Sequence, residues 1–272
     1  MEIVIRAKKK WWLADIKELL HFRDLFYYLT WRDVKVKYKQ TVVGVLWAVF
    51  QPFATMIVFS IFFGKLVGVP SDGTPYPIFV YIGLLFWNLF SGSLNEVAAS
   101  FVTNERIITK VYFPRIILPV STILTNVIDF LIAAGMFVIL MAYFRFIPHW
   151  QGLLLLPVLF AMTVISTLGI GLLFASFNVK YRDVRYILPF FMQLLIFITP
   201  VIYPVSVVSA KYRWILGLNP MSGVIDVARS SLIGTTPIDW TLLGISCLCM
   251  VVYTVIGYFF FKKTERYFAD VI

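Results

Sequence analysis

Long apolar runs separated by short polar stretches dominate the pattern along this chain. A run of about 20 apolar residues is long enough for a helix to cross the hydrocarbon core of a bilayer. The fifth run is short for a full crossing, and prolines end it. The pattern predicts an all-α integral membrane protein, one domain over residues 1–272. Its six transmembrane helices lie over residues 42–63, 77–99, 116–143, 153–177, 187–203 and 240–261.

Residues 1–41 follow another pattern, in which basic residues alternate with apolar ones at three- and four-residue spacings. That spacing gives a helix one apolar and one charged face, as in helices that lie in the membrane interface. A tail helix in solution is the alternative, but Trp11, Trp12 and the adjoining run favour the interface. We therefore expect an amphipathic N-terminal interface helix. Its basic residues at the membrane are candidates to contact headgroups: Arg32, Lys35, Lys37 and Lys39.

A polar island over residues 104–115 separates the second and third runs. Its dense charge is costly in hydrocarbon, so the island lies outside the bilayer. The apolar residues between the charges suit a short helix that presses on another protein, and an ordinary connecting loop is the alternative. Residues 178–186 form a second polar island. The candidates for contact with a partner in the first island are Glu105, Arg106, Lys110, Tyr112, Phe113 and Arg115.

Residues 206–237, between the fifth and sixth runs, contain two short apolar segments, 206–216 and 221–233. Neither is long enough to cross a bilayer. Asn219 followed by Pro220 is a typical helix start, with Asn as the cap and Pro at the first position. We predict two short re-entrant helices hinged there. Such backbone is tolerated in a membrane only when buried against protein or lining a wet cavity.

The basic residues set the orientation. With both termini in the cytosol, nineteen basic residues fall on the cytosolic side and five on the other, which follows the positive-inside rule. The five are Lys65, Arg145, Lys211, Arg213 and Arg229. Both polar islands then face the cytosol.

Composition supports the membrane assignment. The chain is 60% hydrophobic and 14% charged, whereas soluble domains are usually about 45–50% apolar and about 25% charged. The formal charge of +10 lies mostly at the N-terminus and beside the membrane, which favours an anionic lipid surface over nucleic acid. Cys247 and Cys249 are two apart in an apolar run, so a disulfide between them is not expected.

The chain carries no catalytic or metal-binding pattern that we recognise. Gly64-Lys65 lacks the upstream glycine and the following hydroxyl of a phosphate-binding loop, so no cofactor is expected on this chain. Asp129 lies mid-run and Glu96 near a cytosolic end. An acid in a membrane run is a functional candidate, but a helix–helix contact is the favoured interpretation of both.

Aromatic residues make up 18% of the chain, and most are expected to face lipid or anchor the interface. Those beside breaks in the runs are candidates to line a substrate channel, because aromatic faces suit the apolar faces of sugar rings. These candidates are Trp47, Phe50, Phe53, Phe86, Trp87, Phe90, Phe190, Phe191, Phe197 and Tyr203.

Several motifs, spread in order over most of the chain, resemble the polysaccharide-export permeases of the type-2 ABC transporter family, in the Wzm-like group for O-antigen. The teichoic-acid and capsule permeases are near relatives. The motifs are RDVKVKYKQTVVGVLWA (32–48), KVYFPRIILP (110–119), NVKYRDVRY (178–186), TPVIYP (199–204) and LNPMSGVI (218–225).

The resemblance implies a homodimer in the bacterial inner membrane with two copies of a separate cytosolic ATPase, which would use ATP and Mg²⁺. The island at 104–115 would be the coupling helix that docks on that ATPase, and 206–237 would hold the re-entrant helices at the periplasmic exit. The substrate would be a glycan on a polyprenyl diphosphate lipid, whose headgroup would be drawn to Arg and Lys.

Two other functions are weighed against this one. An ion-coupled secondary transporter using Asp129 would need inverted repeats and several membrane acids, and the sequence shows neither. A membrane enzyme acting on lipid-linked sugars would need clustered acids or a metal site, and none is visible. Teichoic-acid or capsule export remains the nearest alternative substrate assignment.

Overall fold

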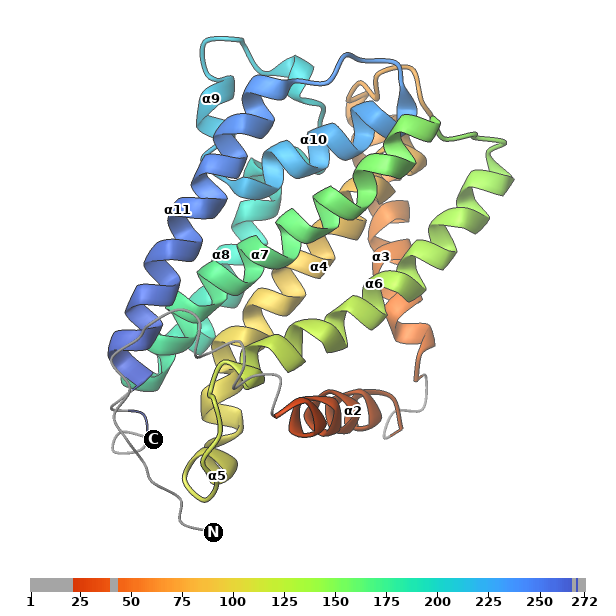
Figure 1. The fold of residues 1–272 in the computed structure, drawn as a ribbon. Helices are drawn as coiled ribbons and strands as arrows, with labels where there is room; N and C mark the ends of the chain where they lie inside the picture. Colours follow the sequence, from red (N-terminus) through yellow and green to blue (C-terminus); the bar gives the residue numbers. More distant parts are fainter. Residues whose placement is uncertain (1–21, 40–43, 266–267, 269–272) are drawn as a thin grey trace.

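The computed structural model describes residues 22–39, 44–265 and 268. Every regular element in those residues is a helix (Figure 1). The larger elements, in chain order, are α2 (Arg23–Lys39), α3 (Leu46–Phe59) continuing into the π-helix η1 (Ser60–Val67), α4 (Tyr76–Thr103), α6 (Ile117–Tyr143), α7 (Trp150–Lys180), α8 (Val184–Ile198), α10 (Pro220–Ile233) and α11 (Trp240–Thr264). The remaining elements are one turn or less: α5 (Glu105–Ile108), η2 (Val205–Val207) and α9 (Arg213–Leu216).

Five helices in the described residues are long and apolar enough to cross a membrane: Leu46–Val67, α4, α6, α7 and α11. They confirm the helices predicted from the first four runs and from the last. The fifth run forms α8, which has 15 residues. At 1.5 Å per residue it is about 22 Å long, less than the ~30 Å hydrocarbon core. The structure therefore gives five candidate spans and one shorter apolar helix.

Helix α4 is the centre of the bundle. In its most apolar window, 78% of the residues are buried, whereas the corresponding share is 11% to 33% in the other four spans. It packs against α3, α6, α7, α8 and α10. An apolar helix buried on most of its surface is typical of a core element, and the outer helices present their apolar surfaces outward.

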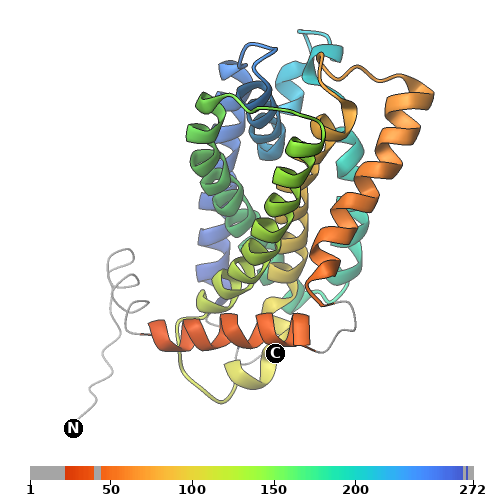
Figure 2. The ribbon, with the colours of Figure 1, turned by 90° about the vertical axis from the view of Figure 1, so that its right-hand side faces the viewer.

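Helix α2 lies across one end of the bundle, roughly perpendicular to the spans (Figures 1 and 2). It packs against α6, and Leu29 joins a small core with Phe101, Ile108, Phe113 and Phe261. This core connects α2, the island at 104–115 and the end of α11. The described part of the predicted N-terminal helix thus forms one helix, and residues 1–21 lie outside the described residues.

The region 206–237 differs in part from its prediction. The first segment holds only η2 and the single turn of α9, while α10 forms a 14-residue helix at the opposite end from α2 (Figure 1). As predicted, α10 starts at Pro220, and the Asn219 side chain caps it by accepting from the Met221 amide at 3.0 Å. Its buried positions include several serines and Arg229, so the surrounding helices, rather than its modest hydrophobicity, keep it buried.

Two glycines let α7 and α11 touch. A Cβ added at Gly257 of α11 would lie 1.9 Å from the Gly169 carbonyl oxygen of α7, and one at Gly169 would lie 2.5 Å from Thr254. Close approach of two backbones at small residues is how membrane helices gain packing contact without a hydrophobic driving force.

We predict that Gly257→Ala lowers the thermal unfolding midpoint of the purified protein. The added methyl must separate the two backbones, at a cost of about 1–3 kcal/mol. The matched control is Gly244→Ala on the same helix, where an added Cβ meets nothing within 4 Å. That control should leave the midpoint unchanged or raise it, because Ala is the better helix former. Equal midpoints for the two variants would contradict the contact.

Candidate functional site

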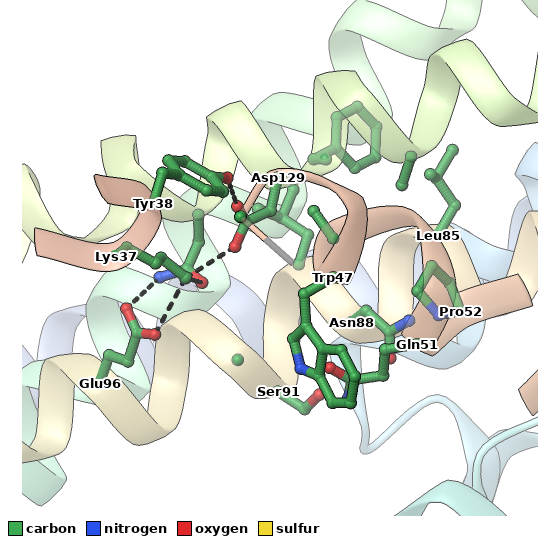
Figure 3. A pocket seen from close by; sticks show the side chains of 17 residues that line it. Lys37, Tyr38, Trp47, Gln51, Pro52, Leu85, Asn88, Ser91, Glu96 and Asp129 are labelled. Atoms are coloured by element: carbon green, nitrogen blue, oxygen red, sulfur yellow. Dashed lines mark hydrogen bonds and ion pairs between the residues drawn. The ribbon is translucent and has the colours of Figure 1, made fainter. Parts of the chain in front are cut away.

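A cavity of about 530 Å³ opens between α2, α3, α4 and α6. Its size is within the range of about 300–1,000 Å³ that is usual for small-molecule sites. Figure 3 shows charged side chains at one end and Trp47, Gln51, Asn88 and Ser91 at the other. Predicted spans provide most of the wall, and α2 contributes only Lys37 and Tyr38.

Lys37 of α2 is the centre of the charged end. Its Nζ lies 2.7 Å from Asp129 Oδ2 on α6 and 3.2 Å from Glu96 Oε1 on α4. Asn126 joins the same cluster by donating from Nδ2 to Glu96 Oε2 at 2.6 Å, and the Tyr38 hydroxyl donates to Asp129. Both membrane acids therefore make helix–helix contacts, as the favoured interpretation expected, and they attach α2 to two spans.

These contacts also set the ionisation of the α2 groups. Burial alone would lower the pKa of Lys37, but attraction to Glu96, together with the hydrogen bond and charge of Asp129, outweighs it and raises that pKa. Burial, followed by the hydrogen bond to Asp129, raises the pKa of Tyr38. Near neutral pH the lysine is thus charged and the phenol is protonated and able to donate.

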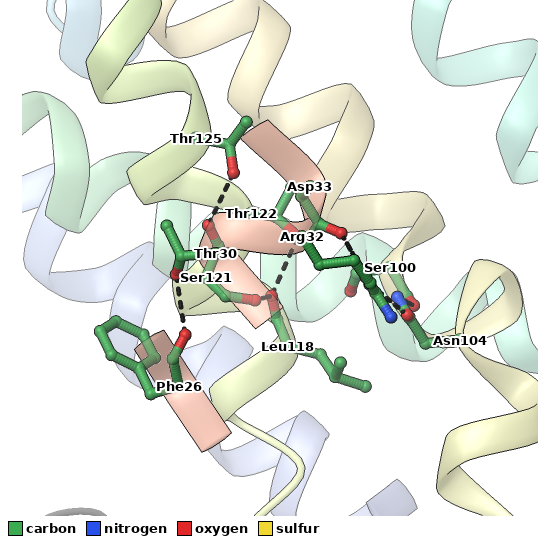
Figure 4. Close-up of polar contacts among 10 residues, drawn as sticks. All are labelled: Phe26, Thr30, Arg32, Asp33, Ser100, Asn104, Leu118, Ser121, Thr122 and Thr125. Carbon is green, nitrogen blue, oxygen red and sulfur yellow. Dashed lines mark hydrogen bonds and ion pairs between the residues drawn. The ribbon is translucent and has the colours of Figure 1, made fainter. Parts of the chain in front are cut away.

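A second polar contact connects α2 to the island. The Arg32 guanidinium donates to Asn104 Oδ1 at 2.8 Å and pairs with Asp33 at 2.7 Å (Figure 4). Asn104 precedes α5 and donates from Nδ2 to the Ser100 carbonyl at the end of α4. Of the four predicted headgroup residues, Arg32 and Lys37 are therefore engaged within the chain, whereas Lys35 and Lys39 are exposed.

The island presents some of its predicted contact residues and uses others internally. Glu105, Arg106 and Lys110 are exposed, and Tyr112 is 84% exposed. Its helix, α5, is only one turn, and a turn and extended chain complete the island.

Two of the predicted island contacts need correction. Phe113 is buried in the small core, so its ring is not available to another protein. Arg115 donates to the Glu265 carbonyl and lies over the Phe268 ring, so it ties the island to the C-terminal end of α11. Phe113 is unavailable because apolar side chains surround it, and Arg115 is unavailable because it already bonds within the chain.

Some of the aromatic residues predicted to line a channel are buried, and others are exposed. Phe86, Trp87 and Phe90 of α4 are buried in the main core, so the expectation that they face a channel is wrong for this chain. Phe53 and Tyr203 are packed against that core. The rings that remain exposed lie on α3 and α8: Trp47, Phe50, Phe190, Phe191 and Phe197.

Arg229 is a residue whose role sequence reasoning missed. It was placed among the five basic residues outside the cytosol, yet its guanidinium is buried and donates to the carbonyls of Phe79, Pro200 and Val201. The guanidinium carbon lies 3.7 Å from the Phe79 ring centroid, and Gly83 leaves it room. Arg229 thus supplies donors to backbone that follows the end of α8. The only signal in the sequence was an Arg in a modestly apolar segment.

Comparison with known proteins adds an independent line of evidence. The family profile described as "ABC-2 type transporter" matches residues 24–233. The chain is 26% identical over 249 residues to an O-antigen export system permease protein RfbA of Klebsiella pneumoniae, covering 92% of this chain and 95% of that protein. It is 32% identical over 211 residues to RfbA of Myxococcus xanthus, covering 76% and 79%. The polysialic acid transport protein KpsM of Escherichia coli is 22% identical over 243 residues, covering 86% and 91%.

We predict that Arg229→Met destabilises the protein by about 2–4 kcal/mol, because buried carbonyls lose their donors. Thermal unfolding of the purified protein measures the effect. Arg182→Met removes an exposed arginine near the start of α8 and should leave the midpoint unchanged. An Arg229→Met protein as stable as the Arg182→Met control would show that the carbonyls find other partners.

We also predict an energetic coupling between Lys37 and Asp129. In a double-mutant cycle of Lys37→Met and Asp129→Asn, the loss of thermal stability in the double variant should be smaller than the sum of the single losses by about 1–2 kcal/mol. Lys35→Met in place of Lys37→Met is the control, and additive losses are expected there. Because Glu96 and Asp129 raise the pKa of folded Lys37 above its ordinary value of 10.5, the coupling should persist through neutral pH and disappear only above pH 10.5. Full additivity for Lys37 and Asp129 near neutral pH would exclude the ion pair.

Proposed function

The chain belongs to the ABC-2 type transporter family, and we propose that it is the permease subunit of an ATP-driven exporter that moves a lipid-linked polysaccharide from the cytosol to the periplasm. The observation that carries this proposal is the near full-length match to permeases named for polysaccharide export. The relatives named for O-antigen are 26% and 32% identical, against 22% for the one named for polysialic acid. That difference favours O-antigen over a capsular glycan.

The proposed topology has six crossings with both termini in the cytosol of a bacterial inner membrane. α8 would make the fifth crossing together with residues 199–204, and α10 would be re-entrant at the periplasmic end. The basic residues of α2, of both islands and of the end of α11 support this orientation. The burial of α10 supports re-entrance, because a short helix at membrane depth must be covered by protein.

A separate ATPase, in two copies, would supply ATP hydrolysis with Mg²⁺, and the island at 104–115 would dock on it. Glu105, Arg106 and Tyr112 are exposed on the island and support this role, because aromatic residues and Arg are enriched at protein interfaces. The small core that contains Phe113 would pass movements of the island on to α2 and α11.

We further propose a homodimer with the glycan path between the two copies. The support is α3, whose span is only 11% buried and carries the exposed rings of Trp47 and Phe50. Phe191 and Phe197 of α8 are exposed in the same manner. Exposed Lys35 and Lys39 would attract the diphosphate headgroup of a polyprenyl-linked glycan, because Arg32 and Lys37 are already engaged.

The direct test is export in cells that lack the gene. Restoring the full chain together with its ATPase should return the glycan to the cell surface, and either one alone should not. Export by the purified chain without any ATPase, or a surface glycan unaffected by the deletion, would exclude the proposed function.

We predict that Tyr112→Ala uncouples the complex. Removing the most exposed ring of the island should reduce glycan export and its stimulation of ATP hydrolysis about tenfold, as for an interface anchor worth about 1.4 kcal/mol. The matched control is Tyr143→Ala at the end of α6, because Tyr143 is 79% exposed and Tyr112 is 84% exposed. Export and hydrolysis are both measured on the reconstituted complex. Equal effects of the two substitutions would argue against docking at the island.

A further inference from the structure

The polar side chains at one end of the cavity beside α2 bond to one another, whereas those at the other end do not. At the charged end, Lys37, Glu96, Asn126 and Asp129 contact one another. One ammonium faces two carboxylates there, so an added phosphate would meet net negative charge. This end is therefore suited to holding α2 in place and is poorly suited to binding an anion.

The other end is neutral and has polar groups to spare. Within the described residues, the side-chain amides of Gln51 on α3 and Asn88 on α4 make no hydrogen bond to protein. Gln51 is exposed and Asn88 is half-buried, and both line the cavity. Each amide can therefore bond to water or to a ligand there.

The two helices present complementary groups to this end. Trp47 and Gln51 are four residues apart on α3, and Asn88 and Ser91 are three apart on α4, so each pair shares one helix face. Figure 3 shows the indole, the two amides and the hydroxyl gathered at the same end of the cavity. Trp47 stacks with Phe50, with 5.6 Å between the ring centroids, and it remains 57% exposed, so part of the indole is open to a ligand.

This set of groups suits a sugar ring. Each amide offers two donors and an acceptor, which match the paired donor and acceptor character of neighbouring ring hydroxyls. The indole face covers the apolar C–H face of the ring. None of the four groups carries charge. Glu96 and Asn88 are eight residues apart on α4, about 12 Å along the helix, so the ring would lie clear of the charged cluster.

We propose that Trp47, Gln51, Asn88 and Ser91 form a subsite for a neutral pyranose of the transported glycan, and that the diphosphate headgroup does not enter it. The inference rests on the proposed export function and specifies which part of the substrate this cavity takes. Gln51, Asn88 and Ser91 become specificity-determining residues, and Trp47 acts as the stacking platform.

Binding is tested on the complex of the chain with its ATPase in lipid nanodiscs. The probe is methyl N-acetylglucosaminide, detected by saturation-transfer NMR, with inorganic pyrophosphate as competitor. Saturation transfer to the sugar is expected in the wild type, with no competition by pyrophosphate. Asn88→Leu and Gln51→Met should abolish it, and Trp47→Phe should retain more of it than Trp47→Leu. The matched control is Gln151→Met, which removes an exposed amide at the start of α7. Three outcomes would exclude the subsite. The wild type shows no saturation transfer, pyrophosphate competes with the sugar, or Asn88→Leu and Gln151→Met give equal signals.

Measuring glycan export in cells distinguishes failure of the subsite from failure of the proposed export function. Asn88→Leu and Gln51→Met should each slow export about tenfold, the effect of one lost buried hydrogen bond. Export is compared at equal amounts of folded protein in the membrane, with Gln151→Met as the reference. If the wild type exports glycan and the cavity variants export it equally well, the subsite is excluded and the function stands. If the wild type exports no glycan, the proposed function itself fails.

Discussion

Buried backbone polar groups must find their partners inside the protein, and this constraint governs the end of the molecule around α8 and α10. Helix α8 stops at Ile198, and the chain that follows cannot complete a regular span. The Arg229 guanidinium supplies the missing donors by bonding to carbonyls of that segment and of α4. A buried guanidinium is costly alone, but five donors in a fixed fork suit several carbonyls at once. Arg229 of α10, a helix buried by α4, α7 and α11, therefore helps to hold the irregular segment, together with the Tyr76 hydroxyl, which donates to the Ile202 carbonyl.

The opposite end is organised by charge. Helix α2 carries several charged residues, and ion pairs on an exposed surface contribute little to stability. Lys37, however, is partly buried and reaches two acids on different spans, so the geometry of α2 is fixed relative to both. Arg32 attaches the same helix to Asn104, at the start of the island. A displacement of the island by a docked protein would therefore be passed directly to α2 and to the charged mouth of the cavity.

The apolar runs predicted the helices well because lipid penalises unsatisfied backbone so strongly that a run of about 20 apolar residues has few alternatives to a helix. The Asn219–Pro220 start was equally readable, because capping is local chemistry. Which aromatic residues are buried and which are exposed could not be predicted from the sequence. Trp47 and Trp87 have equal hydrophobicity, yet one is 57% exposed and the other is 3% exposed. Which face of a helix meets protein is decided by its neighbours, and no local pattern records it.

Contacts between helices also decide which candidate site residues are open to a ligand. The sequence predicts basic headgroup residues, but pairing within the chain removes Arg32 and Lys37 from the set open to a ligand. The sequence analysis did not single out Gln51 and Asn88, whose side-chain amides line the cavity beside Trp47. Gln51 is exposed and Asn88 is half-buried, so both amides are open to a ligand in the cavity. Beside an exposed indole they offer donors, acceptors and an apolar face together, and this combination suits a hydroxyl-rich ligand.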